Sequence, residues 1–174
     1  MTYIHCSPGT KISPEQIPLA LSCGKGQNAS PAGALCPLCR KEGMHIENIT
    51  VRHLLKKEME GKAGQEDYWL CMNERCAAVY YNDKTGTIFE KDDIDVPVWF
   101  KDDANPRYAC YCSRIKDEDV TRAVKEQKIT DMAAIRKFYD PDAKSQCKIK
   151  NPTGRCCSPV FKEIIKKAMG PEER

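Results

Sequence analysis

The pattern of apolar and polar positions divides the chain into a part that predicts strands and a part that predicts helices. In the first part, apolar residues three and four positions apart predict a helix over 51–59, capped by Asn48 or Thr50 and ended by Gly61. Short runs rich in aromatic and β-branched residues follow at 68–70, 78–81, 87–89 and 96–100, separated by turn-forming residues. We expect a small antiparallel sheet with one helix.

From Arg107 onward the strand pattern disappears and three amphipathic segments follow. The first opens with acidic residues at 117–119, which suit the positive end of a helix dipole. The second is capped by Thr130 and stopped by Pro141, and the third begins near Pro159 and ends at Gly170. This part predicts an all-helical domain.

These patterns give a domain organisation and a fold class. We expect an irregular extension over 1–33 with one short helix near 14–21, an α+β domain over 34–104, a helical domain over 105–170, and a tail over 171–174. The fold class is α+β. His5, Cys6 and Cys23 lie in the extension, where isolated groups of this kind are more often bystanders than metal ligands.

Composition favours metal sites over disulfides. The chain has 174 residues, of which 11 are cysteines, and only 7% are aromatic, so two small cores that are each held by a metal fit better than one large core. The cysteine count is odd, several cysteines form close pairs, and neither a secretory segment nor a membrane span is predicted. The short apolar run before Cys23 is too brief for a lipoprotein signal. We expect a cytoplasmic protein without membrane insertion.

Two cysteine pairs in the first part predict a zinc site. Cys36 and Cys39 are separated by two residues, and Cys71 and Cys76 follow on a predicted hairpin turn. Zinc prefers four soft thiolates in a tetrahedron, and such a closed site is usually structural. A redox or sensory zinc and a metal-free arrangement are the alternatives, and His45 could replace one thiolate. We prefer the four cysteines because they complete the set.

The cysteines of the helical part predict a 2Fe-2S cluster, because two irons need two terminal thiolates each. Cys110 and Cys112 can reach one edge of such a cluster, and Cys147 with either Cys156 or Cys157 can close the other edge. No histidine lies in these motifs, so we expect a low-potential, one-electron centre rather than a Rieske type. A second structural zinc and a set of bystander cysteines remain as alternatives.

Charge is unevenly distributed. Residues 107–174 contain 16 Lys/Arg and 10 Asp/Glu, whereas residues 1–106 contain 12 and 15. A basic surround stabilises an anionic cluster and could dock an acidic redox partner, although it could also be a solvated face. With both metal sites loaded, the formal charge of +3 falls to about −1, which does not favour nucleic-acid binding.

These motifs together resemble the two-metal amino-terminal module of CopZ-type copper chaperones, from Cys36 to about Gly170. The carboxy-terminal half also resembles the bacterioferritin-associated ferredoxin family. The resemblance implies zinc at Cys36, Cys39, Cys71 and Cys76, a cluster at Cys110, Cys112, Cys147 and Cys157, and Cys156 as a non-ligand. In that family the module precedes a copper-binding domain with a Met-x-Cys-x2-Cys motif, and its cluster is thought to reduce Cu(II) to Cu(I) for a transport ATPase.

The Met-x-Cys-x2-Cys motif does not occur in these 174 residues, so we expect the electron-carrying module without the copper-carrying domain. The leading hypothesis is a soluble iron-sulfur and zinc redox protein of copper homeostasis, whose partners are copper ions or a copper-handling protein, such as a transport ATPase or separate carrier, and a redox donor protein. If it is an enzyme, it is a metal reductase that acts by outer-sphere transfer. The alternative is a zinc-ordered docking or redox-sensing module without reductase activity.

Overall fold

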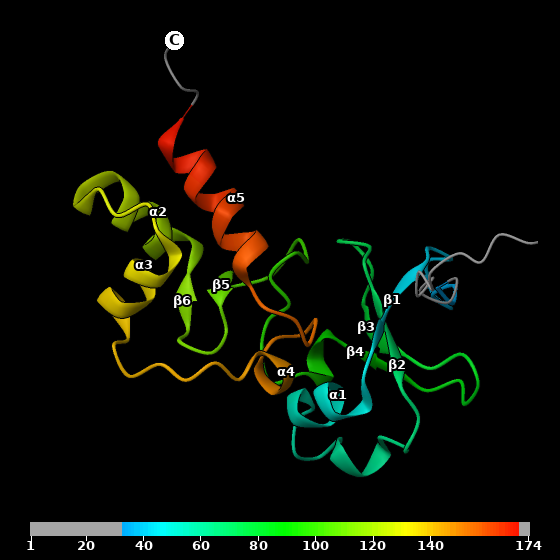
Figure 1. Ribbon diagram of the computed structural model, residues 1–174. Coiled ribbons are helices and arrows are strands. Elements are labelled where there is room, and N and C mark those ends of the chain that lie inside the picture. The colour runs from blue at the N-terminus through cyan, green and yellow to red at the C-terminus, as the bar shows by residue number, and fades with distance from the viewer. Residues whose placement is uncertain (1–32, 171–174) are drawn as a thin grey trace, which may run out of the picture. The chain divides into compact units, whose positions relative to one another are not determined.

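A four-stranded antiparallel sheet forms the centre of the first part of the molecule (Figure 1). The computed structural model describes residues 33–170. The strands β1 (Gly43–Ile46), β2 (Tyr68–Cys71), β3 (Ala78–Tyr81) and β4 (Ile88–Glu90) pair in chain order. The predicted strands at 68–70, 78–81 and 87–89 are therefore present, and β1 is an additional strand. The fold class, α+β with an antiparallel sheet, is confirmed.

The helix α1 (Asn48–Leu54) is shorter than predicted, because Leu55 takes an extended conformation and bridges to Ile94. Neither predicted cap acts at its N-terminus. The Asn48 side chain instead donates to the backbone carbonyls of Gly64 and Glu66, and the Thr50 hydroxyl donates to the carbonyl of Lys148. Both polar side chains thus connect distant segments, which no local pattern reveals. The short helix η1 (Glu60–Lys62) follows.

The segment that leads from the sheet to the second part is not a strand, so the prediction for 96–100 was wrong. After the short helix η2 (Lys91–Asp93), this linker packs Val98 into the core of the sheet. Its backbone is bound to the side chain of Tyr111, whose hydroxyl accepts from Trp99 N–H at 2.9 Å and donates to the Pro97 carbonyl at 2.8 Å. Side-chain partners here replace the pairing that a strand would need.

The second part combines a two-stranded ribbon with four helices, so the prediction that it is all-helical was wrong. The strands β5 (Tyr108–Cys110) and β6 (Ile115–Lys116) pair antiparallel. The helices are α2 (Asp117–Gln127), α3 (Met132–Tyr139), the short α4 (Cys147–Lys150) and α5 (Ser158–Met169). Asp131 caps α3 by accepting from Ala134 N–H at 2.9 Å, where Thr130 was expected. Strands of two and three residues are too short to show an alternating pattern.

Two of the three apolar clusters in residues 33–170 are the main cores of these two parts, which we call the zinc lobe (33–104) and the helical lobe (105–170); the third, small cluster gathers around Cys36, Cys71 and Cys76. The first core packs α1 against the sheet, and the second packs α2, α3 and α5 around the ribbon and includes Cys110 and Cys157. The two lobes meet where α4 lies beside α1 (Figure 1). None of the helices in residues 33–170 has the length and apolar character that a membrane crossing requires.

Candidate metal centres

The four cysteines of the zinc lobe converge on one point. The sulfur atoms of Cys36, Cys39, Cys71 and Cys76 all lie within 4.8 Å of one another. The Cys36 and Cys76 sulfurs are 3.9 Å apart, and those of Cys39 and Cys71 are 3.5 Å apart. A tetrahedral zinc with bonds of about 2.3 Å needs sulfurs about 3.8 Å apart, so this quartet fits a single zinc ion.

Local backbone geometry explains why the first pair is in place. The Cys36 N–H donates to the carbonyl of Lys41 and the Arg40 N–H donates to the carbonyl of Cys36, both at 2.8 Å, and Arg40 adopts a positive φ of 60°. These two hydrogen bonds close the turn that carries Cys36 and Cys39. Although burial opposes it, hydrogen bonds from the Lys41 backbone and the Asn73 side chain lower the pKa of Cys39 to about 6. A thiol with a low pKa supplies the thiolate that a metal needs.

A buried lysine lies behind the second pair. Lys101 is only 1% exposed, and its ammonium donates to four backbone carbonyls at 2.8–3.2 Å, those of Cys71, Asn73, Cys76 and Ala78. Burial lowers its pKa, while the nearby thiols of Cys71 and Cys76 act in the opposite direction. Lys101 thus fixes the loop that carries two ligands and places a positive charge beside an anionic site. Nothing in the sequence around it distinguishes it from a surface lysine.

The two histidines of the zinc lobe make other contacts. The His45 ring lies 3.1 Å from a carboxylate oxygen of Asp67 and packs edge-on against Trp69. His53 is exposed, as expected, and its ring nitrogen contacts the Ile49 carbonyl. The four sulfurs therefore gather without an imidazole. Cys6, Cys23, His5 and the helix predicted near 14–21 lie outside the described residues.

The cysteines of the helical lobe form two pairs rather than one tight quartet. The sulfurs of Cys112 and Cys147 are 3.7 Å apart, and the Cys157 thiol has the largest influence on the pKa of Cys110, which it lowers. This pairing differs from the expected one, in which Cys110 and Cys112 share an edge. Cys110 ends β5 and Cys112 lies in the turn that follows, where the segment after α3 brings Cys147 next to it.

Among residues 33–170, only the zinc-lobe quartet brings three or more ligand atoms within 4.8 Å of one another. The second quartet is therefore wider than a site for one tetrahedral ion. Its pairs also differ in burial: Cys110 and Cys157 are buried, whereas Cys112 and Cys147 are half-buried. The interaction with Cys157 lowers the pKa of Cys110 to about 5, and the same interaction raises the pKa of Cys157.

Two buried polar atoms in the described part of the chain have no hydrogen-bond partner, and both belong to residues beside this quartet. They are Ser113 Oγ and Arg136 Nε. Ser113 follows Cys112 directly, and the charge of Arg136 helps to lower the pKa of both Cys110 and Cys156. The Gln146 N–H also donates to the Cys112 sulfur at 3.2 Å. Unpartnered buried donors in residues next to these cysteines suit an anionic, sulfur-rich group.

The loop that carries Cys147 and Cys157 is supported by the zinc lobe. Thr50 donates to the Lys148 carbonyl at 2.7 Å, and the fully buried Tyr80 hydroxyl donates to the Pro152 carbonyl at 2.7 Å. Gly154 has a positive φ of 66°, and a Cβ atom there would lie 2.8 Å from Thr50 Oγ1. The loop therefore fits closely against α1 and β3.

Cys156 lies apart from the two pairs. Its side chain is exposed, and the backbone and side chain of Ser158 lower its pKa, with a smaller contribution from Cys147. The structure thus places one extra thiol near Cys112 and Cys147, which we call the outer pair because they are less buried than Cys110 and Cys157.

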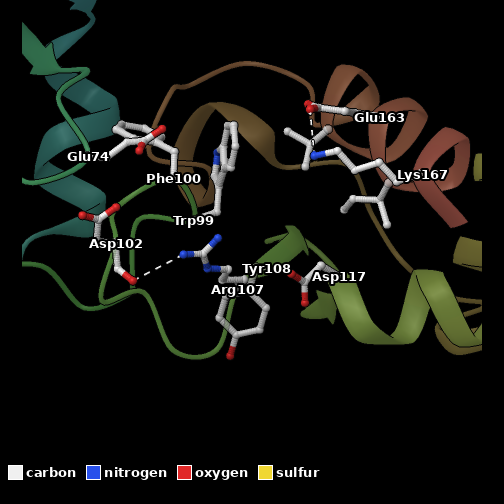
Figure 2. A pocket seen from close by; sticks show the side chains of 11 residues that line it. Glu74, Trp99, Phe100, Asp102, Arg107, Tyr108, Asp117, Glu163 and Lys167 are labelled. Atoms are coloured by element: carbon white, nitrogen blue, oxygen red, sulfur yellow. Dashed lines mark hydrogen bonds and ion pairs between the residues drawn. The ribbon is translucent and has the colours of Figure 1, made fainter.

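A pocket of about 280 Å³ lies between the linker and α5, separate from both quartets (Figure 2). The rings of Trp99, Phe100 and Tyr108 form part of its lining, and Arg107 donates to the Asp102 carbonyl at its edge. No cysteine lines it, so it belongs to neither candidate metal centre.

Comparisons with known proteins agree with the geometry of the zinc lobe. Residues 33–95 match the family model zf_CopZ, described as a zinc binding domain. The copper chaperone CopZ of Archaeoglobus fulgidus is 29% identical over 125 residues, which cover 70% of this chain and 57% of that protein. The X-ray structure of the Archaeoglobus fulgidus CopZ N-terminal domain aligns with a TM-score of 0.61 and 26% identity, covering 75% of this chain and 97% of that domain.

The matched segment thus spans little more than half the length of the curated relative. The four converging sulfurs and the family match together support zinc as the metal of Cys36, Cys39, Cys71 and Cys76. Residues 33–95 are similar in sequence to a zinc-binding domain of the CopZ type, and most of the chain is similar in fold to the N-terminal domain of a CopZ protein.

Proposed function

We propose that this protein carries single electrons through a 2Fe-2S cluster held by Cys110, Cys112, Cys147 and Cys157, and that its zinc is structural. The observation that carries the proposal is the width of this quartet: Cys112 and Cys147 lie 3.7 Å apart, but these four sulfurs do not gather within 4.8 Å of one another as the zinc-lobe sulfurs do. Two irons with two terminal thiolates each hold their sulfurs farther apart than one zinc, which gathers all four around a single ion. The wide quartet therefore favours a cluster over a second structural zinc.

The residues around the quartet suit a low-potential cluster. When bound, such a group accepts and donates one electron at a time. The buried Cys110 and Cys157 keep water from one side of it, and the Gln146 N–H offsets negative charge at Cys112. The start of α5, directly after Cys157, adds the positive end of a helix dipole. The resemblance of this half to the bacterioferritin-associated ferredoxin family supports the same assignment.

We further propose that the electron is used in copper handling. The curated relative is described as a copper chaperone, and the matching solved structure is the N-terminal domain of such a protein. In this role one electron reduces Cu(II) to Cu(I), either as a free ion or while a copper-handling partner holds it. Outer-sphere transfer needs no catalytic acid or base in this chain.

Metal analysis with spectroscopy tests the proposal. Protein purified without oxygen should contain about two irons for each zinc, absorb in the visible range, and give an electron paramagnetic resonance signal after dithionite reduction. A colourless protein with two zincs would refute the cluster.

Two adjacent cysteines provide a matched pair of variants. Cys157→Ala should abolish the visible absorbance and leave zinc content unchanged, because Cys157 is buried beside Cys110. Cys156→Ala removes the exposed neighbour and should keep the cluster. The reverse result would assign the fourth ligand to Cys156.

A further inference from the structure

The outer pair of the second quartet defines an accessible edge. Cys112 and Cys147 are half-buried and Cys156 is exposed, whereas Cys110 and Cys157 are buried in the core of the helical lobe. The shortest path from a group held by this quartet to solvent therefore runs past Cys112 and Cys147. An electron would enter or leave along this path.

Six cationic side chains belong to the segments that carry these cysteines or contact them, and they form what we call the basic rim: Arg114, Arg136, Lys144, Lys148, Lys150 and Arg155. Arg114 lies two residues after Cys112, Lys148 and Lys150 share the turn of α4 that begins at Cys147, and Arg155 precedes Cys156. Lys144 precedes Ser145, whose hydroxyl accepts from Arg136 at 3.3 Å. All are exposed except Arg136, which is half-buried.

These charges are largely uncompensated. Within residues 33–170, Lys148 is the one member of the rim with an ion pair, to Glu47 at 2.7 Å. Residues 141–157 contain four Lys/Arg and a single acid, Asp142. Exposed cations are screened by water, so they contribute little to holding a buried anion. They do create a positive potential outside the protein, which steers charged partners.

Resting on the function proposed above, we propose that the basic rim is the docking surface for an acidic electron-transfer protein, which exchanges electrons with the cluster past Cys112 and Cys147. The same potential repels the Cu²⁺ ion, so copper reaches this edge bound to an acidic carrier rather than as the free cation. In the exchange, one electron leaves the reduced cluster and the acceptor gains it, with no bond formed or broken.

Binding of an acidic probe tests the surface without using electron transfer. A fluorescein-labelled peptide of eight glutamates should bind the oxidised, metal-loaded protein at low salt. Binding should weaken about tenfold or more when the ionic strength rises from about 0.01 M to about 0.15 M and the Debye length falls from about 30 Å to about 8 Å.

Two triple variants with the same change in charge separate the rim from the rest of the surface. Lys144→Glu/Lys150→Glu/Arg155→Glu should abolish peptide binding. Lys84→Glu/Lys125→Glu/Lys166→Glu changes three exposed lysines that lie on separate segments, and should keep most of it. Equal loss in both variants, or preferential binding of a DNA duplex at the rim, would overturn the proposal.

The salt dependence of cluster oxidation gives a second measurement. Oxidation of the reduced protein by the ferricyanide trianion should slow as salt rises, and oxidation by the hexaammineruthenium(III) trication should accelerate. The rim variant should reverse both slopes. If the rim variant keeps its visible spectrum and the salt dependence of both oxidation rates is unchanged, the docking surface alone is rejected. If the wild-type protein holds no cluster, the proposed function is rejected instead.

Discussion

The two cysteine quartets differ in how much of the molecule builds them. The zinc-lobe quartet is closed by local turns and by Lys101, all within one lobe. The second quartet takes Cys110 and Cys112 from the ribbon, while the loop that carries Cys147 and Cys157 rests on Thr50 and Tyr80 of the zinc lobe. The first site is therefore self-contained, and the second depends on the first for its shape.

Because of this difference, we expect the zinc to support the second quartet as well as its own sheet. The zinc site holds β2 and the start of β3, and Tyr80 on β3 supports the cysteine loop. We expect loss of zinc to disturb the second quartet, whereas loss of the second quartet should leave the zinc site intact.

The largest effect should come from Cys71→Ser, which removes a fully buried zinc ligand. Structural zinc sites contribute folding free energy on the order of 10 kcal/mol, so the zinc lobe should unfold and the cluster should be lost with it. Zinc and iron content, visible absorbance and thermal unfolding measure both losses. Met72→Ser, at the exposed neighbouring position, should change neither, and removal of zinc from the wild-type protein by a chelator should reproduce the double loss.

A Cys71→Ser protein that lacks zinc but keeps its full iron content would show that the second quartet forms independently. That result would mean that the second quartet does not depend on the zinc site.

Lys101→Met should have the next largest effect. The substitution removes a donor from the buried carbonyls of Cys71, Cys76 and Ala78, and each unsatisfied buried group costs about 1 to 3 kcal/mol. We expect the free energy of unfolding to fall by about 3 kcal/mol or more and the zinc to exchange faster with a chelator. Chemical denaturation and a colorimetric zinc assay measure these quantities. Lys84→Met, at an exposed position, should be close to wild type, and equal stability of the two variants would contradict the role of Lys101.

Gly154→Ala tests how closely the cysteine loop fits the zinc lobe. The left-handed backbone conformation costs alanine about 1 kcal/mol, and the added methyl group would press against Thr50 Oγ1. Gly86→Ala has nearly the same φ, 71°, but open space around it. The variant at 154 should therefore lose more stability and shorten the lifetime of the cluster, and the variant at 86 should affect stability alone.

Adding Thr50→Ala should recover part of the loss at 154, because it removes the atom that the methyl group meets. Simple additivity of the two substitutions would indicate that the clash does not occur.

The smallest effect should come from Tyr80→Phe, which removes the hydroxyl that donates to Pro152. A single buried hydrogen bond contributes about 1 kcal/mol. Tyr81→Phe is the matched control, because the Tyr81 hydroxyl donates to Ala34 within the zinc lobe. Both variants should lose similar stability, but only Tyr80→Phe should accelerate the bleaching of the cluster in air. Equal bleaching rates would contradict support of the loop by Tyr80.

The parts that the sequence predicts are those in which local spacing determines the structure. The cysteine pairs of the zinc site and the strands β2 and β3 follow from short-range patterns, and the geometry of the zinc quartet agrees with the expectation. The ribbon was missed because its strands are only three and two residues long. Thr50 and Lys148 are 98 positions apart, and Tyr80 and Pro152 are 72 apart, so no local pattern indicates that they meet.

Tyr111 gives the ribbon a fixed orientation about its own axis. Tyr111 lies between Cys110 and Cys112 in the sequence. Its hydroxyl accepts a hydrogen bond from the Trp99 N–H and donates one to the Pro97 carbonyl. Rotation of the turn between β5 and β6 would break both bonds at once. The positions of Cys110 and Cys112 are therefore tied to a segment that contributes no cysteine, and a change in that segment would alter the second quartet without touching any thiol.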